Sequence, residues 1–351
     1  MTTNVHIVAI GARTPLGFQV APGAAAVRAG ISAVQEHPFM TDAVGDPIPG
    51  AFDHELDPCI FGSARLLGLA ETAVREACAL LAPKLASTLR LPLFLGLPEF
   101  RPGFTAKDAS AVRSGIAQLM DESIGVSEVE VFPQGHAAGF VALTEAVRQI
   151  ERGRIEVCLV GGVESYFHPF TMHWLDANRQ VVGTVSRSGF VPGEGAGFCV
   201  VASRRALDRM GLRSLVRVAA TAVGRETKVI KTDAVCLGEG LTRTVEDVLG
   251  QLGPNTGTIN SIICDINGER YRGEEWGFVC LRLSRYFDDP TDYLSPAEYW
   301  GDMGAASAPL FTMLACQAAE RGCSEGPRTL VWASSEGGLR GAAVLETTSA
   351  D

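Results

Sequence analysis

His136 lies in the stretch FPQGHAAGF (132–140), between a predicted strand and a predicted helix. The strand is predicted over EVEVF (128–132), where polar and apolar residues alternate, and the helix over residues 137–153, whose apolar positions face one side. The amino end of a helix leaves backbone N–H groups free and favours negative charge, so this turn suits chemistry on an anion. An imidazole there can act as a hydrogen-bond partner or as a general base.

The composition limits the classes of function. The chain has 351 residues, 46% of them hydrophobic, and a net charge of -10 from 40 acidic and 30 basic residues. No long run of Lys or Arg occurs, so we expect no nucleic-acid partner. The apolar runs have the length of strands, and the first residues lack the basic region of a signal peptide. These features predict a cytoplasmic protein without membrane spans.

The nine cysteines are scattered through apolar segments and form no C-x-x-C pair. This pattern is typical of reduced, buried cysteines rather than a disulfide framework or a zinc site. We therefore expect no metal and no cofactor.

Strand and helix patterns alternate along the chain, which favours an α/β layered fold. Helices are predicted over residues 62–81 and 111–125, among others, and the charged run RYRGEEW (270–276) is interpreted as a solvated loop. A second strand-rich series begins near residue 215. We therefore predict two related halves, 1–210 and 211–351, packed as one unit.

Four strings resemble the β-ketoacyl synthases of the thiolase superfamily. They are IVAIGARTPLG (7–17), residues 135–165, RSGFVPGEGAGFCVVASRRAL (187–207) and SSEGGLRGAAVLE (334–346). The resemblance implies a thiolase-like fold, with two α/β halves stacked as α-β-α-β-α layers around mixed five-stranded sheets. It also implies a homodimer, or a heterodimer with a related active ketosynthase, in which EVEVF pairs across the dimer axis.

The resemblance also places the family's catalytic residues, which are a cysteine that carries the acyl group and two histidines. The cysteine corresponds to His136, the first histidine to Asn267 and the second to Asp302, while the supporting lysine falls near Ala297. Acyl-imidazoles hydrolyse readily, an amide cannot shuttle protons, and an ionised carboxylate repels a developing enolate. Condensation by the family mechanism is therefore not expected.

Other positions receive roles from the same resemblance. Phe167 and Phe170 fall where relatives line the acyl tunnel, and Gly337 and Gly338 form the closing hairpin at the substrate site. Two further residues, Glu194 and Arg187, are expected near the site as structural residues; Glu194 would brace the backbone, and Arg187 would pair with an acid or lie in a surface turn.

Three interpretations of His136 stay open. The histidine fills the vacated position and bonds a carboxylate or backbone oxygen, or it is a general base oriented by Asp302, with Ser307 and Cys264 as the nearest nucleophiles. A metal site formed by His136, Asp302 and Cys264 has no supporting spacing.

Three functions follow from these interpretations. The first is a non-condensing partner subunit that resembles a chain length factor. The second is an enzyme that uses His136 on an acyl thioester as a decarboxylase, hydrolase or acyltransferase. The third is a ligand-binding or scaffold protein. Acyl carrier protein or acyl-CoA are possible partners, although an acidic chain is not an ideal match for an acidic carrier.

Overall fold

The structure is a computed structural model that describes residues 3–79, 81, 89–119, 124–184, 186–230, 232–253 and 257–348. The strands of its main sheet are β1 (Val5–Arg13), β4 (Leu89–Leu97), β5 (Ile124–Pro133), β6 (Val157–Ser165), β7 (Glu194–Ser203), β8 (Val216–Arg225), β9 (Ser261–Cys264), β10 (Arg328–Ser334) and β11 (Leu339–Thr347). The α-helices are α1 (Val20–Arg28), α2 (Gly62–Ala79), α3 (Ala106–Ile116), α4 (Ala138–Glu151), α5 (Pro169–Ala177), α6 (Arg204–Met210), α7 (Glu239–Gln251), α8 (Arg270–Leu283), α9 (Ala297–Trp300) and α10 (Ser307–Glu320). Short 3-10 turns are η2 (Gly135–Ala137), η3 (Ser284–Tyr286) and η4 (Gly304–Ala306), and β2 (Gln35–Thr41) pairs with β3 (Pro47–Gly50) in a separate hairpin.

The main sheet has two halves whose strands pair in the same parallel and antiparallel pattern. Its strand order is β5-β4-β6-β7-β1-β8-β11-β10-β9. In the first half β4 runs parallel to β6, and β7 is antiparallel to both β6 and β1. In the second half β9 runs parallel to β10, and β11 is antiparallel to both β10 and β8. The halves meet where β1 pairs with β8 through only two residue pairs, His6 with Arg217 and Ile7 with Val216.

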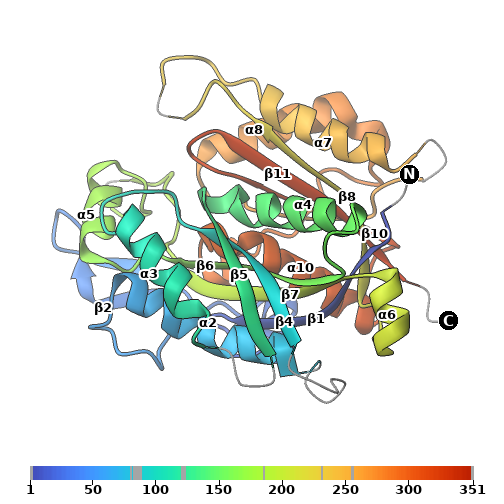
Figure 1. The fold of residues 1–351 in the computed structure, drawn as a ribbon. Helices are drawn as coiled ribbons and strands as arrows, with labels where there is room; N and C mark the ends of the chain where they lie inside the picture. The colour runs from blue at the N-terminus through green and yellow to red at the C-terminus, as the bar shows by residue number, and fades with distance from the viewer. Residues whose placement is uncertain are drawn as a thin grey trace.

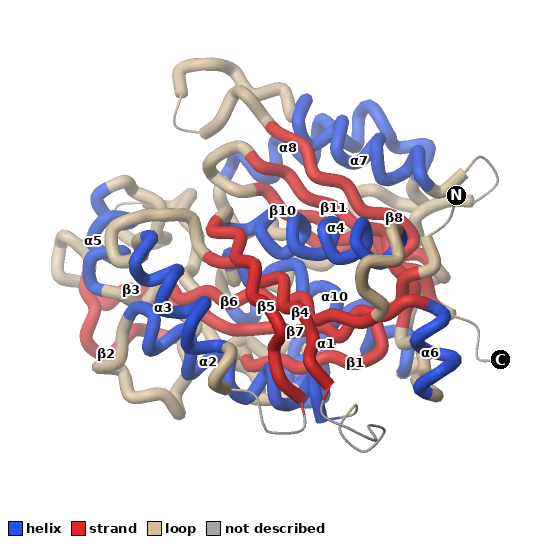
Figure 2. The backbone as a smooth tube through the Cα atoms, viewed as in Figure 1, coloured by secondary structure: helices blue, strands red, loops and turns tan. Residues whose placement is uncertain are grey.

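The halves fold over each other and enclose two central helices (Figures 1 and 2). Helices α4 and α10 lie between the sheet halves, α2 and α3 cover the outer face of the first half, and α7 and α8 cover the second. This arrangement confirms the predicted thiolase-like α-β-α-β-α layering. The first half has the five strands that the resemblance implied, whereas the described residues of the second half contribute four, because nothing there corresponds to β5.

The two ends of the sheet differ. Strand β5 forms one end, where β4 is the strand that pairs with it in the described part of the chain. At the other end, the segment that follows η3 covers β9, since Leu294 donates its N–H to the Ile262 carbonyl (2.8 Å) and Cys264 donates to the Leu294 carbonyl (3.0 Å). Sheet edges with unpaired backbone groups invite further strands, so the chain has one covered end and one open end.

Two predicted elements differ from the structure. The helix predicted over 111–125 is α3, which begins earlier because Thr105 and Asp108 form a capping box, and which ends at Ile116. Residues 120–123 lie outside the described part, and Ile124 already belongs to β5. The run at 270–276, predicted as a solvated loop, opens α8 instead, and Arg272 and Glu275 are buried there.

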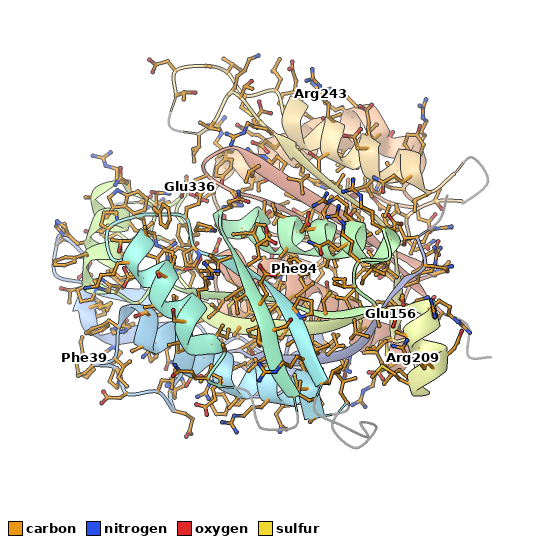
Figure 3. The ribbon with its side chains drawn as sticks, viewed as in Figure 1. Phe39, Phe94, Glu156, Arg209, Arg243 and Glu336 are labelled. Carbon is orange, nitrogen blue, oxygen red and sulfur yellow. The ribbon has the colours of Figure 1, made fainter. Side chains whose placement is uncertain are left out.

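Small residues let the central helices approach the sheet and each other. A Cβ at Gly139 of α4 would lie 2.7 Å from the Cβ of Ala308 in α10, and a Cβ at Gly162 of β6 would lie 2.2 Å from the carbonyl oxygen of Ala305. Larger residues at these positions would push α10 away from the sheet. Side chains fill the space between the layers (Figure 3), and no helix of the described ranges is long and apolar enough to cross a membrane.

Gly162→Ala tests the close packing of β6 against η4. We expect this change to lower the free energy of unfolding by about 2 kcal/mol, because the added methyl group meets backbone that cannot move cheaply. Gly250→Ala in α7 is the control, since a Cβ there meets nothing within 4 Å and should leave the stability unchanged or raise it by up to about 1 kcal/mol. Urea unfolding followed by circular dichroism measures both; equal effects would contradict the packing argument.

Candidate functional site

The candidate site lies where the amino ends of α4 and α10 converge. His136 belongs to η2, which leads into α4, and Asp302 stands two residues before η4, which leads into α10. The imidazole Nε2 lies 2.8 Å and 2.9 Å from the two carboxylate oxygens of Asp302. The two side chains retain only 8% and 2% of their exposed surface. The structure thus brings together two residues that the resemblance selected from opposite halves of the chain.

Asp302 is a fully bonded carboxylate. Besides His136, its oxygens accept hydrogen bonds from the Tyr166 hydroxyl (3.0 Å), the Gly304 N–H (2.8 Å) and the Asn267 amide. Burial alone would raise the pKa of Asp302, but the His136 charge and hydrogen bond, together with Arg272 and Asn267, hold it well below its usual range. Asp302 is therefore ionised, and all three predicted residues join one network in which Asn267 is a donor.

The Asp302 carboxylate favours the positively charged form of His136. Burial alone would lower its pKa, but the adjacent Asp302 carboxylate outweighs both burial and the nearby Arg272 guanidinium, so the pKa lies above its ordinary value. A carboxylate only accepts hydrogen bonds, which assigns a proton to Nε2. The Asp302 carboxylate thus favours the imidazolium form of the histidine, which can donate a proton but is a poor general base.

Arg272 is the residue that the sequence interpretation missed. It is fully buried in α8, and its Nη2 lies 3.1 Å from Nε2 of His136. It also donates to the Ser334 carbonyl (2.7 Å), to Glu269 (3.1 Å) and to Asp265. We call the five ionisable residues the buried charge cluster; they are His136, Asp265, Glu269, Arg272 and Asp302.

Helical periodicity separates the charged run that contains Arg272 into an exposed pair and a buried pair. Arg270 and Glu274, four residues apart, form an exposed ion pair (2.6 Å). Arg272 and Glu275, three residues apart, point inward, where Glu275 binds Arg340 of β11 through two hydrogen bonds. A helical reading of RYRGEEW, with Trp276 beside Glu275, would have placed this second pair on a buried face.

Glu194 and Arg187 have different surroundings. Glu194 is completely buried and accepts two hydrogen bonds from Arg65 (2.6 Å each), one from the Asp53 N–H (2.8 Å) and one from the Ser165 hydroxyl (2.7 Å). It thereby ties β7 to α2, to β6 and to the segment before α2. Arg187 is exposed in the turn between Val181 and Phe190.

A cavity of about 510 Å³ opens beside His136. Its lining combines carboxylates, one guanidinium and aromatic rings; the residues are Glu99, Phe100, Arg101, Pro133, Gly135, His136, Glu164, Tyr166, Trp174, Leu175, Val229, Ile230, Glu336 and Gly337. The Gly337 N–H donates to Glu99 (3.0 Å), and burial raises the pKa of that carboxyl group. Arg101 is already paired with Glu164 (2.5 Å). The lining thus places charged groups among apolar side chains.

The predicted tunnel residues lie elsewhere. Phe167 is buried against His37 and Phe52, next to the β2–β3 hairpin, and Phe170 is exposed at the start of α5. Of the two hairpin glycines, Gly337 lines the cavity, while Gly338 has a φ of 99° that favours glycine in the turn between β10 and β11.

Neither suggested nucleophile lines this cavity. Cys264 is buried at the end of β9, where burial raises the pKa of its thiol well above the ordinary value, and Ser307 is buried at the start of α10. Among the residues that the structure describes, the one group with metal-ligand spacing is Glu226, Cys236 and Glu275, which is not the set of His136, Asp302 and Cys264. Glu275 is moreover committed to Arg340.

Comparison with known proteins identifies this architecture. Residues 135–206, the segment that begins one residue before His136, match the family model of the β-ketoacyl synthase N-terminal domain. No curated protein sequence matches the chain. The resemblance to β-ketoacyl synthases is thus confirmed around the candidate site, over about a fifth of the chain.

Solved structures extend the likeness to the whole fold. The ishigamide ketosynthase/chain length factor matches with a TM-score of 0.81 at 16% identity, covering 99% of this chain and 100% of that chain. A type II PKS ketosynthase complex with its acyl-carrier protein matches with a TM-score of 0.79 at 16% identity, with the same coverage. The ketosynthase from module 6 of the Bacillus subtilis bacillaene synthase gives 0.76 at 14% identity, covering 99% and 72%. The chain therefore has the fold of these ketosynthase structures.

The charge state of His136 can be measured directly. We expect its imidazole to titrate above the ordinary pKa of about 6.5, and to titrate below that value in Asp302→Asn, because burial and Arg272 then act unopposed. NMR of the imidazole signals against pH, assigned with His136→Gln, gives both values. A wild-type pKa below that of the variant would contradict the ion pair.

The same pair sets a pH dependence of stability. The raised pKa of His136 stabilises the fold below the ordinary histidine pKa, and this contribution is lost as the pH rises through the folded value. The lowered pKa of Asp302 stabilises the fold above the ordinary aspartate pKa, and this contribution is lost at acid pH. Asp302→Asn should therefore cost most between about pH 4 and 6.5, on the order of 3 kcal/mol in urea unfolding, and less above the folded pKa of His136.

Proposed function

We propose that the chain is a non-condensing ketosynthase homologue that serves as a partner subunit in fatty-acid or polyketide-type acyl metabolism. The observation that carries this proposal is the His136–Asp302 ion pair. It occupies the position where the resemblance places the acyl-carrying cysteine and one of the two histidines.

The chemistry of the pair argues against condensation. The reaction needs a nucleophile that stores an acyl group and donors that stabilise an enolate. Here the protonated Nε2 of His136 is bonded to Asp302, and the Asp302 carboxylate would repel an enolate. Asn267 donates an N–H of its side-chain amide to the same carboxylate. A lone pair on Nε2 would become available only after the ion pair is broken.

A partner role accounts for what the chain retains. The fold matches a ketosynthase/chain length factor along both chains, and the open edge of β5 offers a surface for pairing with a related subunit. By analogy with the ketosynthase complex, acyl carrier protein or an acyl-CoA is the proposed small partner. The nine cysteines are present as thiols, which is consistent with a cytoplasmic location.

A second candidate is an enzyme that acts on an acyl thioester by other chemistry. It is favoured by the cavity beside the site, which His136 and Tyr166 both line. In that case the imidazolium would act first as a general acid toward a carbonyl or leaving group, as a decarboxylase, hydrolase or acyltransferase requires at one step. Among the described residues, the lining of this cavity contains no Ser, Thr or Cys that could act as a nucleophile. This candidate function is therefore the weaker one.

Intact-mass analysis separates the two candidates. After incubation with malonyl- and acyl-carrier protein and with CoA thioesters, we expect no adduct and no release of free CoA or carbon dioxide above a blank. His136→Gln, which keeps a donor for Asp302, should behave like the wild type and like His173→Gln, a change at an exposed histidine. Turnover lost in His136→Gln alone would establish the enzyme instead.

The partner role has its own measurement. Coexpression with an intact Cys-His-His ketosynthase should give a one-to-one complex and a higher rate of product formation than the ketosynthase alone. If neither a complex nor turnover is found, the chain is a ligand-binding or scaffold protein.

A further inference from the structure

Asp265 is the member of the buried charge cluster whose carboxylate is bonded on one side only. It directly follows β9 and is 4% exposed. Its Oδ2 accepts hydrogen bonds from the Ser334 N–H (2.6 Å) and from Arg272. Within the described ranges of the chain, no group donates to its buried Oδ1, and burial raises the pKa of this carboxyl group. A buried acceptor without a donor lowers the stability of the fold, so we expect a donor beside Oδ1.

A small cavity lies against Asp265. It has a volume of about 10 Å³ and lies between the end of β9, α9 and the start of α10. Asp265, Asp302 and Ser307 belong to its polar lining, and the rings of Trp300 and Phe311 belong to its apolar walls. A cavity can hold a water molecule when its volume reaches roughly 10 Å³ and two to four polar groups are within reach. This cavity therefore has room for one water molecule and for no larger ligand.

Ser307 is the second polar group that this cavity offers. It is the first residue of α10, is 1% exposed and lies outside the lining of the cavity beside His136. A hydroxyl group both donates and accepts, so it can bond a water molecule that itself donates to a carboxylate. The Asp302 oxygens, by contrast, already accept hydrogen bonds from His136 and Asn267. Asp265 and Ser307 thus remain as the two partners, one at the end of β9 and one at the start of a central helix.

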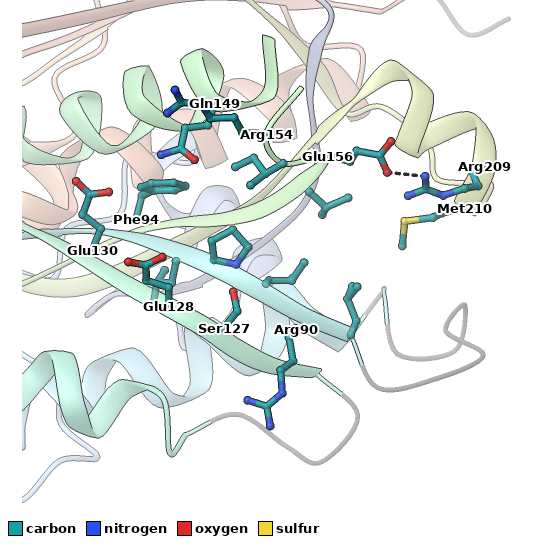
Figure 4. Close-up of a pocket in the computed structure, with 16 residues that line it drawn as sticks. Arg90, Phe94, Ser127, Glu128, Glu130, Gln149, Arg154, Glu156, Arg209 and Met210 are labelled. Atoms are coloured by element: carbon teal, nitrogen blue, oxygen red, sulfur yellow. Dashed lines mark ion pairs between the residues drawn. The ribbon is translucent and has the colours of Figure 1, made fainter. Parts of the chain in front are cut away.

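A larger cavity shows that volume alone does not define such a site. About 540 Å³ of space runs along β4 and β5 (Figure 4). Its charged groups pair with each other or reach solvent, since Arg209 binds Glu156 (2.5 Å) and Glu128 is exposed. In the part of its lining that the structure describes, no buried polar side-chain atom lacks a partner. The small cavity differs because it joins an enclosed volume to an unpaired oxygen.

We propose that one water molecule occupies the cavity between β9 and α10, donates a hydrogen bond to Oδ1 of Asp265 and shares a second hydrogen bond with the Ser307 hydroxyl. The inference goes beyond the proposed function and holds equally for a partner subunit and for an enzyme. The water completes the hydrogen bonding of Asp265, which in turn binds Arg272 next to His136. Ser307, a suggested nucleophile in the sequence, is a ligand of this water instead.

A crystal structure of the whole chain tests which occupant the cavity holds. We expect a single peak of electron density within about 3.0 Å of both Oδ1 of Asp265 and Oγ of Ser307. A monovalent cation is the alternative occupant, because the three carboxylates of the cluster outnumber its two cationic groups, His136 and Arg272. Crystals soaked in Rb⁺ should show no anomalous signal at the peak. An anomalous signal there, or an empty cavity, would overturn the proposal.

A measurement in solution counts the bound water directly. Ser307→Thr keeps the hydroxyl group but adds a methyl group that takes up the volume of the cavity. Magnetic relaxation dispersion of the water signal should therefore detect one long-lived internal water molecule fewer than in the wild type. Ser203→Thr is the matched control, because its hydroxyl accepts the Ala206 N–H (3.1 Å) at the start of α6, and it should leave the number unchanged.

A second variant keeps the test valid if Ser307→Thr does not fold. Ser307→Ala adds no bulk and removes one of the two partners of the water, so its residence time should fall at least about threefold. Circular dichroism establishes that each variant is folded before the water is counted. Equal numbers of long-lived waters in the wild type and in folded Ser307→Thr, or an unchanged residence time in Ser307→Ala, would contradict the proposal.

Discussion

The Asp302 carboxylate is the contact on which the centre of the molecule depends. Two helix amino ends converge there, and both favour negative charge because their first N–H groups lack partners within the helix. Asp302 supplies that charge permanently and accepts the Gly304 N–H at the start of η4. It also holds His136 at the start of α4 and Tyr166 after β6. One side chain thus joins both halves of the sheet.

This constraint explains why the neighbouring charged residues form a set. A buried carboxylate without cations would be costly, and a buried histidine without an anion would lose its charge. His136 and Arg272 supply the cations, while Asp265 and Glu269 hold Arg272 in place. Each residue makes sense only with the others present.

Periodicity and glycine spacing depend on neighbours along the chain, so they predict the alternating strands and helices well, whereas the family resemblance implied how the layers stack. It also predicts that His136, Asn267 and Asp302 come together, since family strings anchor each of them. The burial of Arg272 was not predicted because a run of charged residues is normally solvated. Only the position of α8 against the rest of the fold shows that one face of this helix is buried. Phe167 and Phe170 were assigned to a tunnel by analogy, but the β2–β3 hairpin covers the first and solvent surrounds the second. The surroundings of these two side chains depend on tertiary packing, which the local sequence pattern does not determine.

The unequal ends of the sheet limit how large an assembly built through this sheet can become. Because the segment after η3 already lies along the edge of β9, the described part of the main sheet has one uncovered end, at β5. Edge pairing therefore consumes that edge on both partners and leaves no site for a third chain. If the edge of β5 pairs with another chain, growth by strand addition would stop at two subunits.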